Sequence, residues 1–464
     1  MTTDVGGSTT QAGRAVWGSK IAFILAAAGS AVGLGNIWAF PTVAGQNGGA
    51  AFLLVYLGAV ALIGAPVMLA ELIVGRKTLR NPVGAFKALA PRSAWVMVGG
   101  LGVLTGIMIL SFYTVIAGWT LAYILKTVTG TFGPDADTAA IFADVAGNPV
   151  AAIGWHFAFM VLTIVVVFGG VRDGIERWTK VLMPLLVALL VLLAIRAVTL
   201  PGAGAGLEFY FKPDFSKVTG SVVLAAIGQA FFSLSLGMGA MITYGSYVSK
   251  KDDLVSSAAW VTAFDTAIAI LAGLIIFPTL FYAGLEPGVG GAGMVFVVLT
   301  SLFGSIPPEP YGGVIFGTGF FLLLAIAALT SSVSLLEVTV AWMVDERKVS
   351  RHRAAIMLGG LAFLIGIPSA LANGAVGWLS SLPGVGLDFL SFLFTVFGQY
   401  ALVIGALFIS LFVGWVWGIS AAGEEVRVND GKFPLGRTWA FLIRFVCPVA
   451  IVLILGQLIW SLIG

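Results

Sequence analysis

The sequence predicts an all-α integral membrane protein with eleven transmembrane helices, of which the first and the sixth are broken. Its 464 residues are 59% hydrophobic and only 10% charged, whereas soluble proteins have about 25% charged residues. Apolar runs of about 20 residues, the length that crosses a bilayer as a helix, recur along the chain. These runs are too long for the strands of a transmembrane barrel, and they lack the alternation of such strands.

The apolar runs divide the chain into eleven expected spans joined by polar segments. A shorter apolar piece, Met294–Phe303, has about ten residues and fits a re-entrant or interfacial helix better than a span. The expected spans are 19–44, 50–75, 96–125, 150–170, 178–200, 220–248, 255–283, 312–344, 354–374, 388–420 and 438–463.

Positively charged residues indicate the orientation, because Lys and Arg concentrate in cytoplasmic loops. With a cytoplasmic N-terminus, 19 of the 24 Lys and Arg residues fall in inside segments. The outer side then has only Lys126, Arg196, Lys212 and Lys217, and Arg444 lies in the inner part of the last helix. We therefore expect segments 1–18 and 421–437 in the cytoplasm, and loop 201–219 and the C-terminus outside.

Glycines and polar residues interrupt the first and sixth spans at corresponding depths. The first contains "SAVGLGN", residues 30–36, and the sixth contains "FFSLSLGMGA", residues 231–240. Paired interruptions in two halves indicate an inverted-repeat transporter with its site at the midplane. Five spans, an odd number, separate the two breaks, so the second repeat is inverted. Glycines that only permit close helix packing are the alternative, but that alternative poorly explains Asn36 and Ser233.

A single cysteine and two histidines limit the chemistry of the chain. Cys447 is the only cysteine, so no intrachain disulfide can form. His156 and His352 lie too far apart in the sequence to suggest a metal site, and no nucleophile–base pair is evident. We therefore expect that the protein is not an enzyme.

The interrupted spans and one further segment resemble known motifs. "GSAVGLGNIWAFP", "GQAFFSLSLGMGAMITYGSY" and "ALTSSVSLLE" are similar to motifs of the neurotransmitter:sodium symporter family, particularly its bacterial amino-acid transporters. The resemblance implies the fold of the bacterial leucine transporter and a sodium-coupled amino-acid symporter working by alternating access. It also implies a repeat of helices 1–5 over 19–200, a repeat of helices 6–10 over 220–420, and an extra helix over 438–464.

The resemblance implies two sodium ions at the broken helices. Sodium is a hard cation that takes oxygen ligands, and unwound backbone supplies carbonyl oxygens that no longer bond within a helix. The first site would use Ala31, Asn36, Ser233 and Asp265; the second would use Gly29, Val32, Ala327, Thr330 and Ser331. Considered alone, the hydroxyl triplet 330–332 is better explained by ordinary interhelical hydrogen bonding; opposite a broken first helix, the ion site is the better explanation.

Asp265 is the most informative charge, because the helix "WVTAFDTAIAILAGLIIF" around it is otherwise apolar. A carboxylate inside the membrane costs about 2.5 kcal/mol or more unless it is compensated. Chloride-dependent relatives use an anion nearby, and two sodium ions, a substrate carboxylate and Asp265 sum to zero charge. We therefore expect chloride-independent transport. A protonated structural Asp265, or a proton-coupled transporter that uses it, is the alternative.

The resemblance also implies the substrate site. Free N–H groups at a half-helix N-terminus attract a carboxylate, and the substrate's ammonium group would face backbone carbonyls. The implied residues are Ala31, Gly33, Leu34, Gly35, Ile109, Tyr113, Phe232, Ser233, Ser235, Met238, Ser332 and Leu335. Because few of these are polar and Met is adaptable, hydrophobic L-amino acids, aliphatic to aromatic, are the expected substrates; glycine or alanine is the alternative.

Gates are expected on both sides of the membrane. The resemblance pairs Arg14 with Asp345 on the cytoplasmic side, near Trp17 and Tyr247. On the outer side it matches Asp388 to the acidic gate residue, but Ala39 stands where many relatives carry Arg or Lys. We therefore expect closure there to use Tyr113, Phe232 and water near Asp388 instead. Glu71 resembles a carboxyl group that supports the unwound sixth helix.

Other functions and partners follow from the same observations. A channel and a non-transporting amino-acid sensor are the rival functions; a compact pocket between two gates disfavours the channel. We expect a multi-pass protein of the bacterial inner membrane with two sodium ions and no required chloride as cofactors. Its partners would be the amino-acid substrate and the bilayer, without nucleic acid. A monomer would suffice for transport, and the oligomeric state stays open.

Overall fold

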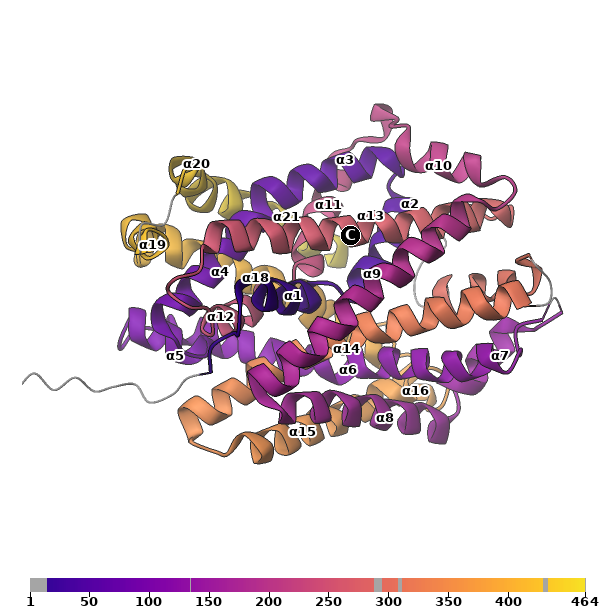
Figure 1. Cartoon of the computed structure of the whole chain (residues 1–464), viewed down its shortest axis with the longest axis horizontal. Helices are drawn as coiled ribbons and strands as arrows, with labels where there is room; N and C mark the ends of the chain where they lie inside the picture. Colours follow the sequence, from indigo (N-terminus) through magenta and orange to yellow (C-terminus); the bar gives the residue numbers. More distant parts are fainter. Residues whose placement is uncertain (1–14, 134, 288–293, 308–310, 429–432, 464) are drawn as a thin grey trace, which may run out of the picture.

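Every regular element of the described structure is helical, which confirms the all-α prediction (Figure 1). The computed structural model describes residues 15–133, 135–287, 294–307, 311–428 and 433–463. Labels with α denote α-helices, and labels with η denote π- or 3-10-helical segments. The elements of the first half are α1 Lys20–Ala31, η1 Gly35–Ala39, α2 Phe40–Gln46, α3 Ala50–Ala59, η2 Val60–Gly64, α4 Ala65–Thr78, α5 Pro82–Leu89, α6 Val96–Val128, α7 Thr138–Ala146, α8 Pro149–Phe168, η3 Gly170–Glu176, α9 Arg177–Val198, α10 Ala203–Phe211 and η4 Phe215–Lys217.

The second half continues the same pattern of long helices with short connections. Its elements are α11 Gly220–Ser233, α12 Ala240–Gly245, α13 Leu254–Tyr282, η5 Met294–Val298, η6 Thr300–Ser305, α14 Tyr311–Arg347, α15 Arg351–Leu371, α16 Gly377–Ser380, α17 Phe389–Leu393, η7 Phe394–Ala401, α18 Leu402–Leu411, η8 Phe412–Val416, α19 Ile419–Val426, α20 Gly436–Phe441, η10 Leu442–Val446 and α21 Cys447–Ile463. The apolar piece after α13 therefore forms two short helical segments, η5 and η6.

Nine helices in the described ranges are long and apolar enough to cross a membrane, and a bent pair makes a tenth span. The bent pair joins α1 to the helix Gly35–Gln46 at 54°. The remaining expected span, 220–248, consists of the shorter apolar helix α11 and the six-residue α12. The count of eleven spans therefore stays a prediction.

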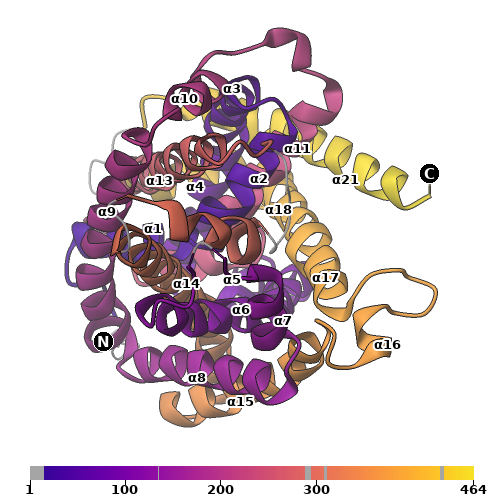
Figure 2. The same cartoon turned by 90° about the vertical axis from the view of Figure 1, so that its right-hand side faces the viewer.

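The long helices run lengthwise through the molecule and surround the two broken ones (Figure 1). The third and eighth expected spans, α6 and α14, have 33 and 37 residues and pack against each other. The short helices α5, α12 and α19 lie at one end, and α7, α10 and α16 lie at the other, where Figure 2 looks onto them. The two breaks, between α1 and η1 and between α11 and α12, thus lie between the two ends of the molecule.

Both helix breaks occur where the sequence predicted them. At the end of α1, Val32 takes an extended conformation with ψ of 111°. Between α11 and α12, Ser235, Gly237 and Gly239 have φ of 53°, 86° and 76°. These values lie in the left-handed region that glycine enters at little cost, so the glycines of "LGMGA" provide the turn.

A backbone contact holds the second break against α18. A Cβ atom on Gly237 would lie 2.0 Å from the carbonyl oxygen of Leu402, and one on Gly405 would lie 2.1 Å from the carbonyl oxygen of Gly237. Real Cβ atoms do not approach this closely, so both positions require glycine. The unwound segment is therefore packed directly against the backbone of α18.

We predict that Gly237→Ala destabilises the protein by at least about 2 kcal/mol, because it combines left-handed strain with a backbone clash. The melting temperature of the detergent-purified variant should fall accordingly. Gly154→Ala in α8 is the control, since nothing lies within 4 Å of a Cβ there and φ is ordinary. Equal melting temperatures for the two variants would contradict the proposed tight contact.

Candidate functional site

Side chains from three helices hydrogen-bond the backbone groups that the first break leaves without helical partners. The N–H of Gly33 donates to Asn36 Oδ1 at 3.0 Å, and the N–H of Leu34 donates to the Tyr113 hydroxyl at 3.1 Å. Gln229 Nε2 donates to the carbonyl oxygen of Gly35 at 3.0 Å. The sequence analysis missed Gln229, although it lies one turn before Ser233 on the same helix face.

A buried carboxylate brings together three of the residues expected at the first ion site. Asp265 is fully buried in α13. Its Oδ1 accepts from Asn36 Nδ2 at 2.7 Å, and its Oδ2 accepts from the Ser233 hydroxyl at 2.8 Å. Tyr56 of α3, which sequence reasoning missed, donates its hydroxyl to Ser233 at 3.3 Å. The buried carboxyl group is thus hydrogen-bonded by Asn36, which follows the first break, and by Ser233 of α11.

A second group of oxygen atoms lies where α14 faces α1. The Ser331 hydroxyl lies 2.9, 3.3 and 3.5 Å from the carbonyl oxygens of Val32, Ser30 and Gly29. Thr330 donates to the Ala327 carbonyl oxygen at 3.0 Å, and a Cβ atom on Gly29 would lie 3.2 Å from Thr330 Cβ. All five residues expected at the second ion site are therefore neighbours, and several oxygens close together suit a hard cation.

A cavity of about 40 Å³ lies between the two breaks. At 10–15 Å³ for one water, it has room for about three water molecules, so a larger ligand must widen it. Residues lining it are Ser30, Ala31, Gly33, Gly35, Ile109, Tyr113, Phe232, Ser235, Met238, Ser331, Leu335 and Leu402. Nine of these were expected at the substrate site and Ser331 at the second ion site, whereas Ser30 and Leu402 were expected at neither.

Three residues expected at the substrate site lie outside this lining. The side chain of Ser332 faces α8 instead, where its hydroxyl lies 2.9 Å from Thr163 Oγ1. Ser233 points to Asp265, and Leu34 contributes its backbone N–H to Tyr113. Ser235 lines the cavity and donates its hydroxyl to the Ser30 carbonyl oxygen at 3.0 Å, which ties the second break to the first.

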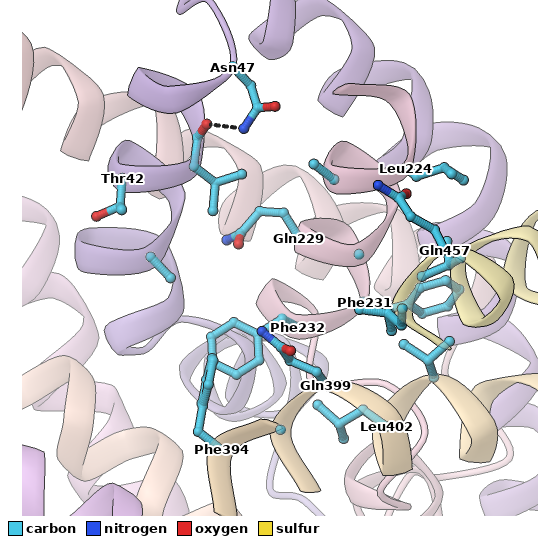
Figure 3. A pocket seen from close by; sticks show the side chains of 18 of the residues that line it. Thr42, Asn47, Leu224, Gln229, Phe231, Phe232, Phe394, Gln399, Leu402 and Gln457 are labelled. Carbon is cyan, nitrogen blue, oxygen red and sulfur yellow. Dashed lines mark hydrogen bonds between the residues drawn. The ribbon is translucent and has the colours of Figure 1, made fainter. Parts of the chain in front are cut away.

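A larger hollow, which we call the vestibule, adjoins the cavity and has a volume of about 530 Å³ (Figure 3). Phe232 and Leu402 line both spaces. In the part of the chain that the structure describes, every residue lining the vestibule is uncharged. They come from the second half of the first broken helix, α11, η7, α18 and α21, and include Ala39, Thr42, Asn47, Gln229, Phe394, Gln399 and Gln457.

Asp388, expected at an outer gate, caps the N-terminus of α17. Its Oδ1 accepts from the Ser391 N–H at 2.9 Å, and its Oδ2 accepts from the Ser391 hydroxyl at 2.5 Å. Ala39 lines the vestibule, whereas Asp388 does not. The structure therefore gives the Asp388 carboxylate a local capping role.

The end of the molecule opposite the vestibule is closed by an aromatic plug, which consists of Trp17, Tyr244 and Tyr247. Trp17 Nε1 donates to the Tyr244 carbonyl oxygen at 3.1 Å, and the Trp17 N–H donates to the Tyr247 carbonyl oxygen at 3.1 Å. The Trp17 ring packs edge-on against both tyrosines and is only 4% exposed. Arg14, expected here, lies outside the described residues; Asp345 accepts from Asn81 at 3.1 Å.

Ion pairs reinforce the plug end. Glu337 of α14 is fully buried, forms an ion pair with Arg351 and accepts from the Tyr247 hydroxyl at 2.8 Å. Glu425 of α19 is also buried and accepts from Arg76 at 3.0 Å and from Lys250 at 2.5 Å. Ion pairs therefore stabilise the plug end, whereas the described residues that line the vestibule carry no charge.

Glu71 of α4 lies against the second break. The carboxyl group is fully buried, and its Oε1 accepts from the Gly237 N–H at 2.7 Å. Unwound backbone in a membrane protein must find such partners. The contact therefore gives the buried Glu71 carboxyl group a structural role at the unwound segment.

Comparisons with known proteins agree with this architecture. The model of the sodium:neurotransmitter symporter family matches residues 14–139 and 146–463. An uncharacterized sodium-dependent transporter, YhdH of Bacillus subtilis, is 40% identical over 96% of this chain and 97% of its own. The Drosophila melanogaster sodium-dependent serotonin transporter is 28% identical over 98% of this chain and 78% of its own. The crystal structure of MhsT in complex with L-phenylalanine superposes with a TM-score of 0.87 at 48% identity, over 96% of this chain and 100% of that one.

We predict that Trp17→Ala loosens the plug end, because it removes a buried ring and a hydrogen bond to α12. Amide hydrogen exchange of residues 20–31 and 240–247 should accelerate at least tenfold, which corresponds to about 1.4 kcal/mol. Trp17→Phe, which retains an aromatic ring, should show a smaller effect. Exchange in Trp17→Ala equal to that of the wild type would refute the closure by Trp17.

Proposed function

Because the chain belongs to the sodium:neurotransmitter symporter family, we propose that it is a sodium-coupled importer of hydrophobic L-amino acids. The observation that carries this proposal is the convergence of Asp265, Asn36 and Ser233 at the first break, beside a cavity lined by both breaks. The carboxylate supplies an anionic oxygen, and unwound carbonyls supply neutral ones. As a multi-pass membrane transporter of this family, it would reside in the bacterial inner membrane with its plug end in the cytoplasm.

The substrate would bind across the two breaks. N–H groups around Leu34 and Gly35 and the Tyr113 hydroxyl would hold its carboxylate. Its side chain would press against Ile109, Met238 and Leu335. The related MhsT was solved with L-phenylalanine, which supports a hydrophobic substrate here. Because the cavity measures only about 40 Å³, binding would require Phe232, Met238 or Leu402 to move outward.

Two sodium ions would be cotransported with the substrate. The first would bind between Asn36 and Asp265 next to the substrate carboxylate, and the second between Val32 and Ser331. Binding of the second ion would replace the Ser331 hydrogen bonds to the α1 carbonyls with ion–oxygen contacts. Each ion would thus join the first broken helix to a helix of the second repeat, which couples ion binding to closure.

A small amino acid, glycine or alanine, is a second candidate substrate. The observation in its favour is the volume of the cavity, which accommodates a small side chain with the least rearrangement. Both candidates share the ion sites and differ only in how far Phe232 and Met238 move.

We predict that hydrophobic amino acids raise the melting temperature of the purified protein in sodium but not in choline. At a ligand concentration 100 times Kd, binding should add about 2.7 kcal/mol. All twenty amino acids would be measured in both salts. Stabilisation only by glycine or alanine would support the second candidate. Stabilisation that is indifferent to sodium but varies with pH would instead support proton coupling through Asp265.

We predict that replacing chloride with gluconate leaves uptake unchanged, because Asp265 provides the fixed negative charge beside the first sodium ion. In Asp265→Asn the sodium concentration for half-maximal uptake should rise at least tenfold, equivalent to about 1.4 kcal/mol. Chloride should partly restore uptake, since the Tyr56 and Ser233 hydroxyls can donate to an anion. Asp253→Asn, at the N-cap of the same helix, is the matched control because Asn caps as well as Asp. Uptake by the wild type that requires chloride would refute this charge assignment.

A further inference from the structure

The side chain of Phe232 lies at the boundary between the cavity and the vestibule. Phe232 and Leu402 line both spaces. Phe232 belongs to the last turn of α11, directly before the second break. Any ligand that passes between the vestibule and the cavity must therefore displace one of these two side chains.

A second phenylalanine holds Phe232 from the vestibule side. The rings of Phe232 and Phe394 have centroids 5.5 Å apart and an interplanar angle of 83° (Figure 3). This edge-to-face geometry is favourable because a positive ring edge meets a negative ring face. Phe394 is the first residue of η7 and lines only the vestibule.

The Phe394 ring is itself positioned from two directions. Phe112 of α6 lies edge-on to it, with ring centroids 6.0 Å apart and an interplanar angle of 85°. A Cβ atom on Gly398 would lie 3.0 and 3.3 Å from atoms of the Phe394 ring. The absence of a side chain at Gly398 thus lets the ring lie against its own helix. Three aromatic rings form a continuous row from α6 through η7 to α11.

Charged groups play no comparable part at this boundary. The described residues that line the vestibule are uncharged, and Ala39 provides no cation. Asp388 caps α17 through both of its carboxylate oxygens. The outer ion pair that the sequence resemblance would place here is therefore not formed. Position 39 is an alanine, and the Asp388 carboxylate is used in the helix cap.

We propose that an aromatic gate of Phe232 and Phe394, seated on Gly398 and backed by Phe112, closes the vestibule side in place of an ion pair. The proposal rests on the proposed transport function. Phe394 is a positioning residue: it holds the Phe232 ring over the cavity and does not line the cavity itself. Because the contact is between neutral rings, closure is insensitive to ionic strength, unlike an exposed ion pair.

The test measures how fast bound L-phenylalanine leaves the purified protein. The tritiated amino acid is bound in sodium, and its dissociation into excess unlabelled L-phenylalanine is followed at constant sodium, with and without added choline chloride. In Phe394→Ala dissociation should be roughly two- to tenfold faster, the range that one edge-to-face contact supplies. Phe394→Leu, which keeps apolar bulk, should be intermediate. Asp388→Asn retains the cap and should stay within about twofold of the wild type in both salts.

The outcomes separate this inference from the proposed function. If the wild-type protein binds no amino acid in a sodium-dependent manner, the proposed function is refuted, and the aromatic gate is refuted with it. A wild type that binds normally, with dissociation accelerated by Asp388→Asn or by salt, overturns the aromatic gate alone. If Phe394→Ala does not fold, Phe394→Leu decides: a dissociation rate equal to that of the wild type also overturns the gate.

Discussion

Two helices expose backbone N–H and C=O groups in the interior of a protein that crosses a bilayer, and the rest of the structure depends on how these groups are satisfied. Hydrocarbon offers them no partners. Asn36 accepts from the Gly33 N–H, Gln229 donates to the Gly35 carbonyl oxygen, and Glu71 accepts from the Gly237 N–H. Each partner comes from the break itself or from a neighbouring helix. The site is therefore built by the same contacts that make broken helices tolerable, and binding and stability share one set of residues.

The helix breaks could be predicted from the sequence because glycines and an asparagine contradict their apolar surroundings. The positions of Asn36, Ser233 and Asp265 followed from the same contradiction together with a resemblance. The sequence did not predict which hydroxyl of the triplet 330–332 faces the cavity. Successive helical residues point about 100° apart, and the sequence does not show where α8 packs in the tertiary structure. Ser332 consequently faces Thr163. The part played by Phe394 was equally hidden, since one phenylalanine among many carries no local signal.

The two ends of the molecule are closed by different physical means. At the plug end, buried carboxylates of Glu337 and Glu425 meet Arg and Lys side chains, and Trp17 inserts between two tyrosines. Buried ion pairs need well-defined partners, since a carboxylate that loses its cation is strongly destabilising. Aromatic contacts at the vestibule have shallower and less directional minima. The plug end therefore depends on contacts whose partial loss is costly, whereas the vestibule side depends on contacts between neutral rings.

The contact between Gly237 and Gly405 has a consequence for how this sequence can change over evolutionary time. Most steric conflicts in a protein core can be relieved by a second substitution that trims the opposing side chain. Here the opposing atoms are backbone carbonyls, and no residue is smaller than glycine. No compensating replacement elsewhere can admit a side chain at either position. The two glycines, 168 residues apart in the sequence, are thus locked together, and lineages that keep this packing can vary the pocket only around them.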